Sequence, residues 1–299
     1  MYSDTATVFD VRPSSEFVET TYIREITNRA LDYIKIGFPV HFSGPAGVGK
    51  TTLALHLAAK LGNPTVLIGG NHEFNSSDLI GGLYGYHKKY VKDNFIRSVL
   101  KTDERLTQQW VDNQLTIACK YGLTLVYDEF TRSRPEANNV LLSVLEEKIL
   151  YLSTAHSGEN YIKVHPSFVA IFTSNPAEYA GVYRSQDALR DRMVTLELGN
   201  FDEETEIQIA RAKSHLGLED VRRVVNLLRR VREAKSDKLT PTVRASIIIS
   251  KILNLKGEHA DASNPMFGQI CMDVILPEVP KEEREIVKRV INEVARTYY

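Results

Sequence analysis

The 299-residue sequence contains few residues that could cross-link it or bind a structural metal ion. Its only cysteines, Cys119 and Cys271, lie far apart in the chain. Two distant cysteines do not make the dense framework of a small secreted domain, so we expect reduced, buried thiols in a cytosolic protein. No Cys-x-x-Cys pair occurs and the eight histidines are scattered, so a structural zinc site is not expected.

The sequence also lacks a long apolar run and an excess of charge of one sign. Nothing approaches about 18 consecutive apolar residues, which excludes a membrane-spanning helix. The N-terminal segment has neither a basic start nor an apolar centre, so no signal peptide is expected. The formal net charge is −1, so no overall field attracts the chain to nucleic acid or anionic membrane. We therefore expect a cytoplasmic protein with neither a nucleic-acid nor a membrane partner.

The most informative segment is glycine-rich and lies between a short apolar run and an amphipathic helical pattern. Its residues are Gly44, Pro45, Ala46, Gly47, Val48, Gly49, Lys50, Thr51 and Thr52. The spaced glycines allow successive backbone N–H groups to point at one phosphate, at the N-terminus of the following helix. Lys50 can then reach the β- and γ-phosphates, and the Thr51 hydroxyl can bind Mg²⁺. The alternative, a glycine-rich turn with an incidental lysine, does not account for the flanking patterns. The sequence therefore predicts a P-loop that binds a nucleoside triphosphate with Mg²⁺.

Five short apolar runs rich in β-branched and aromatic residues predict strands. They cover Phe38–Ser43, Thr65–Gly69, Leu123–Tyr127, Phe168–Thr173 and Val194–Leu198. Long or helical connections separate these runs, which predicts an α/β fold with a five-stranded parallel sheet covered by helices. Two further stretches do not fit a bare P-loop fold, so we expect insertions there. One, near residues 71–90, is rich in glycine and aromatic residues, and the other, near residues 149–164, has the pattern of a β-hairpin.

Beyond residue 200 the pattern is helical throughout. The predicted helices cover Glu203–Leu216, Val221–Val231, Thr242–Lys256 and approximately residues 282–297. Gly217 and Gly257 follow two of these helices as expected C-caps. We therefore expect two domains: an α/β nucleotide-binding domain over residues 1–200 and an all-helical lid domain over residues 201–299.

Polar side chains follow two of the predicted strands. Asp128 and Glu129 end an apolar strand, the Walker B arrangement, in which Asp128 can hold Mg²⁺ and Glu129 can polarise the attacking water. Asn175 ends the next strand and can orient that water, because its amide carries both a donor and an acceptor. The alternatives are a solvated strand end and an Asn-Pro turn. The P-loop earlier in the chain favours the catalytic interpretation.

Arginines precede the last predicted strand and open a lid helix. Arg190 and Arg192 suit an arginine finger, which acts on the γ-phosphate bound by a neighbouring subunit. The alternative for both is surface ion pairing with Asp187 and Asp191. Arg244 can contact phosphate as the lid closes, or can be an ordinary exposed helix residue.

A cluster of five arginines lies along one predicted helix of the lid. They are Arg222, Arg223, Arg229, Arg230 and Arg232. Because they are placed opposite the apolar stripe of that helix, we expect a solvated or subunit-facing surface rather than a nucleic-acid site.

The motifs, in this order and with a helical second domain, resemble those of AAA+ ATPases. Finer detail resembles the MoxR-like branch of that family, through residues 75–81, 128–135, 188–193 and 242–245. Within the branch, Phe74–Gly82 and Tyr127–Asn139 are similar to the gas vesicle protein N family, and the likeness extends over roughly residues 8–260. The segment before the last strand usually carries a single Asp-Arg in MoxR-like proteins. The additional Arg190 therefore leaves the identity of the finger open, with Arg192 favoured.

The resemblance implies an ATPase that converts ATP and water to ADP and phosphate and forms a homo-oligomeric ring, with a hexamer favoured. It also implies association with gas vesicles and remodelling of vesicle shell or accessory proteins during vesicle formation and growth. The alternatives are a general MoxR-like chaperone that activates another protein complex, and a scaffold that binds nucleotide without hydrolysis. Glu129 and Asn175 argue against the scaffold. The first insertion carries Tyr84, Tyr86 and Tyr90, which either grip a partner or pack the insertion against its own domain.

Overall fold

The computed structural model describes residues 8–9, 17–93, 101–152, 160–175, 187–235, 240–261 and 264–297, with only the backbone described between residues 83 and 109. The chain divides into two compact units. The first comprises Met1–Val11, Ile36–His41 and Leu61–Val194, and the second comprises Arg12–Lys35, Phe42–Lys60 and Thr195–Tyr299. Because these units are interleaved along the sequence, the two expected domains, 1–200 and 201–299, remain a prediction.

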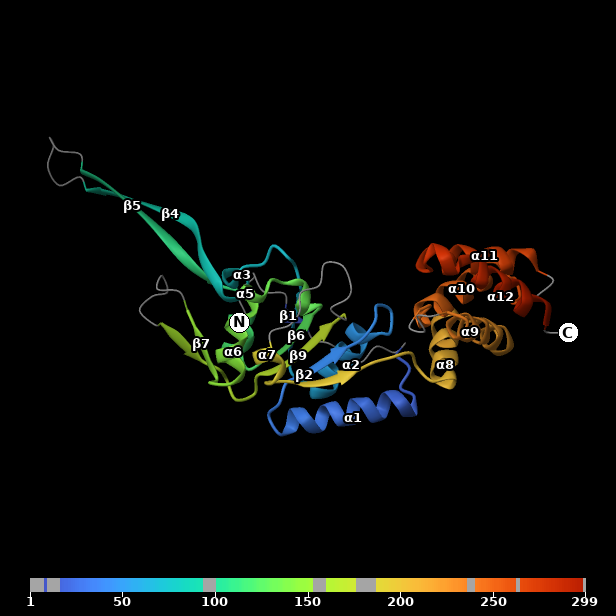
Figure 1. Ribbon diagram of the computed structural model, residues 1–299. Helices are drawn as coiled ribbons and strands as arrows, with labels where there is room; N and C mark the ends of the chain where they lie inside the picture. Colours follow the sequence, from blue (N-terminus) through green and yellow to red (C-terminus); the bar gives the residue numbers. More distant parts are fainter. Residues whose placement is uncertain are drawn as a thin grey trace. The chain divides into compact units, whose positions relative to one another are not determined.

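The main β-sheet has the strand order β1-β3-β6-β9-β2-β10 (Figure 1). The strands are β1 Val8–Phe9, β2 Val40–Ser43, β3 Thr65–Gly69, β6 Thr124–Asp128, β9 Val169–Ser174 and β10 Val194–Glu197. The short edge strand β1 pairs antiparallel with β3. The other five strands correspond to the five predicted ones and form the parallel sheet of an α/β fold, which confirms the predicted fold class.

Strand register places the ends of β3, β6 and β9 at one edge of the sheet. In the parallel β3–β6 pair, Gly69 lies beside Asp128, and in the parallel β6–β9 pair, Tyr127 lies beside Phe172. The residues that follow β6 and β9 therefore meet at the same edge, where open α/β sheets place their functional side chains.

A hydrophobic core covers this part of the sheet. The helices between the N-terminus and β10 are α1 Thr21–Lys35, α2 Lys50–Leu61, α3 Ser76–Ile80, α4 Gln114–Tyr121, α5 Pro135–Asn138, α6 Val140–Leu145 and α7 Asp187–Arg190. Side chains of α4 and α6 pack with β3, β6 and β9 in one buried cluster. The largest fully buried side chains there include Tyr127, Phe130 and Phe172. Burial raises the pKa of Tyr127 to about 12, and its hydroxyl donates to Ser133 Oγ at 2.7 Å.

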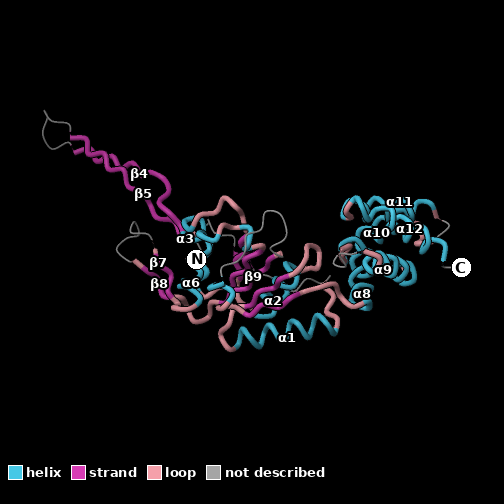
Figure 2. Tube along the Cα trace, viewed as in Figure 1, coloured by secondary structure: helices cyan, strands magenta, loops and turns pink. Residues whose placement is uncertain are grey.

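The first insertion is a long β-hairpin, as Figure 2 shows by its paired strands. Strands β4 Gly81–Asp93 and β5 Lys101–Asp112 pair antiparallel between α3 and α4. The hairpin begins at Gly81, whose φ of +129° and close approach to the carbonyl oxygen of Val111 leave no room for a side chain. The insertion therefore extends beyond residues 71–90. Tyr84, Tyr86 and Tyr90 belong to β4, but their side chains lie outside the described part of the structure.

A second, shorter hairpin precedes β9. Strands β7 Ile149–Tyr151 and β8 Tyr161–Lys163 pair antiparallel, with Tyr151 opposite Tyr161. This pair lies where the sequence predicts a hairpin, and residues 153–159 lie outside the described residues.

The C-terminal part of the chain is helical. Its helices are α8 Glu203–Ser214, α9 Leu218–Glu233, α10 Val243–Lys256, α11 Pro265–Ile275 and α12 Arg284–Thr297. Gly257 is the C-cap of α10, with a φ of +66°, as predicted. The C-cap of α8 is His215, with a φ of +59°, and Gly217 is instead the N-cap of α9. The sequence analysis missed α11, whose residues join the buried cluster that α8, α9 and α10 form. Within the described residues, no helix is long and apolar enough to cross a membrane.

A buried ion pair joins α8 to α9. Glu206 is fully buried, and its Oε2 accepts a hydrogen bond from the buried Arg232 at 2.6 Å. Arg229 lies 3.5 Å from the same oxygen. The expectation that all five arginines of this helix face solvent or a subunit is therefore wrong for Arg232. Its charge is compensated inside the lid, because α9 extends beyond the predicted helix and turns this residue toward α8.

Candidate nucleotide site

The P-loop joins β2 to α2 in the second compact unit. Gly47 and Gly49 have φ values of +88° and +84°, which only glycine adopts without strain. The Lys50 ammonium is buried and donates to the carbonyl oxygens of Gly44 at 2.8 Å and Pro45 at 2.7 Å. A glycine-rich curl with a buried cation at a helix N-terminus has the features that bind phosphate groups.

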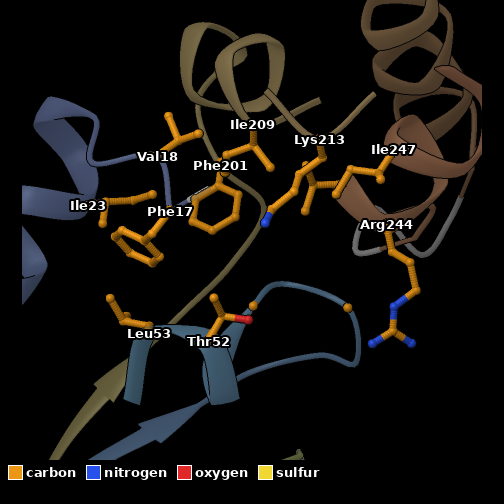
Figure 3. A pocket seen from close by; sticks show the side chains of 13 residues that line it. Phe17, Val18, Ile23, Thr52, Leu53, Phe201, Ile209, Lys213, Arg244 and Ile247 are labelled. Atoms are coloured by element: carbon orange, nitrogen blue, oxygen red, sulfur yellow. The ribbon is translucent and has the colours of Figure 1, made fainter. Parts of the chain in front are cut away.

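A cavity of about 230 Å³ lies beside this loop, within the same unit (Figure 3). Its lining is mostly apolar and comes from segments that are far apart in the sequence. The lining residues are Phe17, Val18, Ile23, Gly47, Gly49, Thr52, Leu53, Phe201, Ile209, Lys213, Val243, Arg244 and Ile247. An apolar cavity with a few polar groups next to a phosphate loop can take the base and ribose of a nucleotide.

Phe17 and Val18, which precede α1 in the sequence, form part of the cavity wall. Contacts to α2 and α8 hold this segment in place. Phe17 stacks on His56 with ring centroids 3.8 Å apart and an interplanar angle of 11°. Burial lowers the pKa of His56, which favours the neutral ring in this stack. Glu19 pairs with Lys60 at 2.8 Å, and Thr205 donates to Thr20 at 2.9 Å. The contacts of Phe17 and Glu19 hold this segment against α2, and the contact of Thr20 holds it against α8.

Two cations extend from lid helices toward the P-loop. In Figure 3, the Lys213 amine from α8 and the Arg244 guanidinium from α10 both point toward the loop. Arg244 is the lid arginine that the sequence predicts. Lys213 was missed, because a single lysine in the last turn of an amphipathic helix carries no motif. Together they place two cationic side chains in the lining of the cavity.

The lid also touches the P-loop backbone directly. A Cβ atom on Gly47 would lie 2.3 Å from Thr242 Oγ1, at the N-cap of α10, whereas a Cβ atom on Gly49 would meet nothing within 4 Å. Gly47 is therefore required both for its backbone conformation and for the approach of α10.

The Walker B residues lie in the first compact unit, at the end of β6. Thr173 of β9 joins them, because its hydroxyl donates to Asp128 Oδ1 at 2.5 Å and accepts from the Glu129 N–H at 2.9 Å. Asn175 donates to Glu129 Oε1 at 3.4 Å. The structure therefore brings together the three residues that the sequence places at two strand ends, Asp128, Glu129 and Asn175.

Glu129 has a second partner that the sequence analysis did not identify. Its Oε2 lies 2.7 Å from Arg132 Nε, in the single 3₁₀ turn Phe130–Arg132 that follows β6. The pair joins residues three apart, yet no pattern in the sequence indicates it.

The two candidate finger residues differ in their surroundings. Arg192 donates from Nε to Glu146 Oε2 at 2.8 Å and from a terminal nitrogen to the carbonyl oxygen of Ala188 at 2.5 Å. Arg190 is exposed at the end of α7. Arg192 therefore takes part in an ion pair within its own chain, the alternative to a finger, and the partner among the described side chains is Glu146.

The donors for Mg²⁺ fit a site shared with phosphate rather than a protein cage. Among the described residues, no group of three or more histidine, cysteine, aspartate or glutamate side chains is arranged to hold a metal ion. Mg²⁺ in nucleotide sites needs one or two protein oxygens together with phosphate and water. Thr51 and Asp128 carry oxygen donors of that chemical kind, each in its own compact unit, and their role in holding Mg²⁺ remains a prediction.

We predict that Gly47→Ala destabilises the nucleotide-free protein more than Gly49→Ala. Both substitutions impose a strained positive φ, which costs about 1–2 kcal/mol, but only Gly47→Ala also collides with Thr242. We expect a further loss of about 1–3 kcal/mol for Gly47→Ala, measured by chemical denaturation. Adding Thr242→Ala should recover that further loss, and equal losses for the two single variants would contradict the packing of α10 on Gly47.

Comparison with known proteins places these features in a family. Residues 39–193 match the model of the AAA domain, dynein-related subfamily. A gas vesicle ATPase GvpN from Ancylobacter aquaticus is 48% identical over 88% of this chain and 74% of its own. A second GvpN, from Haloferax mediterranei, is 40% identical over 88% of this chain and 75% of its own. Protein NorQ of Paracoccus denitrificans is 26% identical over 75% of this chain and 76% of its own.

Solved structures support the fold. The RuvB Holliday junction branch migration motor of Thermotoga maritima aligns over 95% of this chain and 80% of its own, with a TM-score of 0.54 and 18% identity. At that identity the likeness concerns the fold alone. From its AAA domain and its extensive identity to the gas vesicle ATPases, we conclude that the chain is an ATPase and belongs to the GvpN family of AAA proteins.

Proposed function

We propose that this ATPase drives a step in gas vesicle formation and growth by remodelling vesicle shell or accessory proteins. The observation that carries the proposal is the 48% identity to a gas vesicle ATPase over 88% of the chain. On this proposal the protein acts in the cytoplasm at the vesicle surface. The exposed aromatic pair of the second hairpin, Tyr151 and Tyr161, offers one surface for a protein partner.

Nucleotide binding is assigned to the P-loop and the lid. Lys50 and the loop N–H groups hold the β- and γ-phosphates, and the apolar cavity holds the base. Arg244 and Lys213 complete the cationic side of the site. Thr51 and Asp128 would hold Mg²⁺, which would supply positive charge to the phosphate oxygens.

Hydrolysis is assigned to the Walker B strand end. Glu129 takes a proton from water as the water oxygen bonds to the γ-phosphorus and the bond from that phosphorus to the β–γ bridging oxygen breaks. Asn175 orients this water. Support comes from Thr173, which fixes the backbone between Asp128 and Glu129, so that two adjacent carboxylates take different directions and different tasks.

The active form is proposed to be a homo-oligomeric ring, with a hexamer favoured. A finger on Arg192 acts on the γ-phosphate bound by a neighbouring subunit. Within its own chain Arg192 is paired with Glu146, so it must exchange that carboxylate for the phosphate when the ring forms. Arg190, which is exposed, is the alternative finger.

We predict that Lys50→Ala abolishes ATP binding, whereas Glu129→Gln binds ATP but hydrolyses it at least ~100-fold more slowly, the usual scale for a missing general base. The two residues have different tasks, phosphate binding and water activation. Fluorescent-nucleotide titration and phosphate release measure the two quantities separately. Turnover at the wild-type rate by Glu129→Gln would show that another group activates the water.

We predict that Arg192→Ala binds ATP normally but loses hydrolysis by ~10³-fold or more, the range known for arginine fingers. Mixing it with Lys50→Ala should restore part of the activity, because an intact P-loop then meets an intact finger across an interface. Arg190→Ala provides the matched control. If the mixture stays inactive, or if turnover per chain does not depend on protein concentration, the trans arrangement is wrong.

The role in vesicles is tested in a host that carries the vesicle gene set. We predict that a Glu129→Gln strain makes small or narrow vesicles, because shell growth depends on hydrolysis rather than on nucleotide binding. Electron microscopy measures vesicle length and width, with immunoblots to equalise the amount of protein. Full-sized vesicles in this strain would refute an ATP-driven role and leave a scaffold role.

A further inference from the structure

A buried histidine, His41 of β2, contacts the end of the strand that precedes Asn175. Its Nε2 atom is hydrogen-bonded to Ser174 Oγ at 2.8 Å, within the first compact unit. Ser174 is the last residue of β9, and both side chains are buried. Buried polar groups have lost their contacts with water, so they need hydrogen bonds inside the protein. The pair therefore ties β2 to the end of β9.

Aromatic neighbours hold the His41 ring in its orientation. Phe130 meets this ring at an interplanar angle of 90°, with the two centroids 5.3 Å apart. Phe130 in turn packs on Phe172 of β9, with centroids 5.4 Å apart. All three side chains are buried. Because rings in a close-packed interior have little freedom to rotate, the His41 Nε2 atom stays directed at Ser174.

The end of β9 is bonded to the strands on both sides of it. In the sheet, β9 lies between β6 and β2. The Thr173 hydroxyl bonds to Asp128 at the end of β6 at 2.5 Å, and the Ser174 hydroxyl bonds to His41 of β2. Because successive strand residues point to opposite faces of a sheet, the two bonds act on opposite faces. Asn175 therefore follows a backbone that is held from two directions.

We propose that His41 is a positioning residue for ATP hydrolysis. Through Ser174 it holds the end of β9, so that the Asn175 amide keeps the direction in which it orients the attacking water. This inference rests on the proposed role of Asn175. The Asn175 side chain is buried, so the direction of its amide follows the backbone that carries it. Small displacements of a group that orients a reactant slow the reaction strongly, so the loss of this bond lowers turnover.

The test measures kcat and the KM for ATP in His41→Leu and in Ser174→Ala, which remove opposite sides of the hydrogen bond. Each variant should lower kcat roughly three- to tenfold, the usual scale for one buried hydrogen bond, and leave the KM unchanged. His41→Gln keeps a nitrogen that can bond to Ser174, so its kcat should stay near the wild type. The matched control is Thr124→Val, which removes a buried hydroxyl at the opposite end of β6 and should not change kcat.

Combination with Asn175→Ala distinguishes positioning from a general loss of stability. Because His41 acts through Asn175, His41→Leu should not slow hydrolysis further in the Asn175→Ala background. Single-turnover phosphate release, with enzyme in excess of ATP, measures these slow rates. Thermal melts check folding, and Ser174→Ala carries the same comparison if His41→Leu does not fold. An equal further loss in the Asn175→Ala background would overturn the proposal, and so would a raised KM with an unchanged kcat.

The same variants separate this proposal from the assignment of Asn175. If Asn175→Ala retains the wild-type turnover, Asn175 does not orient the water, and both the assignment and the positioning role fail. If Asn175→Ala is slow while His41→Leu and Ser174→Ala turn over at the wild-type rate, only the positioning role of His41 is wrong.

Discussion

The hydroxyl of Thr173 joins the two strands on which the catalytic proposal depends. It donates to the side chain of Asp128 on β6 and accepts from the backbone N–H of Glu129. The Thr173 hydroxyl donates in one direction and accepts in another, so it holds two successive residues, Asp128 and Glu129, at the end of β6. Glu129 has a left-handed backbone at this point, and its carboxylate accepts from Asn175 at 3.4 Å. Parallel pairing of β6 with β9 brings Thr173 to this position.

Three of the charged residues expected to act on ATP have partners within the chain. Lys50 donates to carbonyl oxygens of its own loop, Glu129 is paired with Arg132, and Arg192 is paired with Glu146. Unpaired charges are costly in partly buried positions, and these internal partners lower that cost. On the proposed mechanism, each of these residues exchanges its internal partner for phosphate or water.

The nucleotide cavity depends equally on contacts between distant segments. Residues before α1, the P-loop, α8 and α10 each contribute part of its wall. Phe17 is held by its stack on His56, and α10 is held by its close approach to Gly47. The P-loop and these lid helices belong to one compact unit, so the whole lining of the cavity comes from that unit.

Local patterns in the sequence determined the P-loop, the five parallel strands and most lid helices, because strand runs, glycine spacing and helical periodicity depend on neighbouring residues. The sequence also identified Asp128 and Glu129 as candidate site residues, because they directly follow an apolar strand run. Only the tertiary structure decided the partners: Glu146 for Arg192, Glu206 for Arg232, and the place of Lys213 beside the P-loop. Even the short-range pair of Glu129 with Arg132 was not readable. It accompanies a left-handed backbone at Glu129 that the sequence around it does not favour, next to Thr173 of β9 and to Gly70, which follows β3.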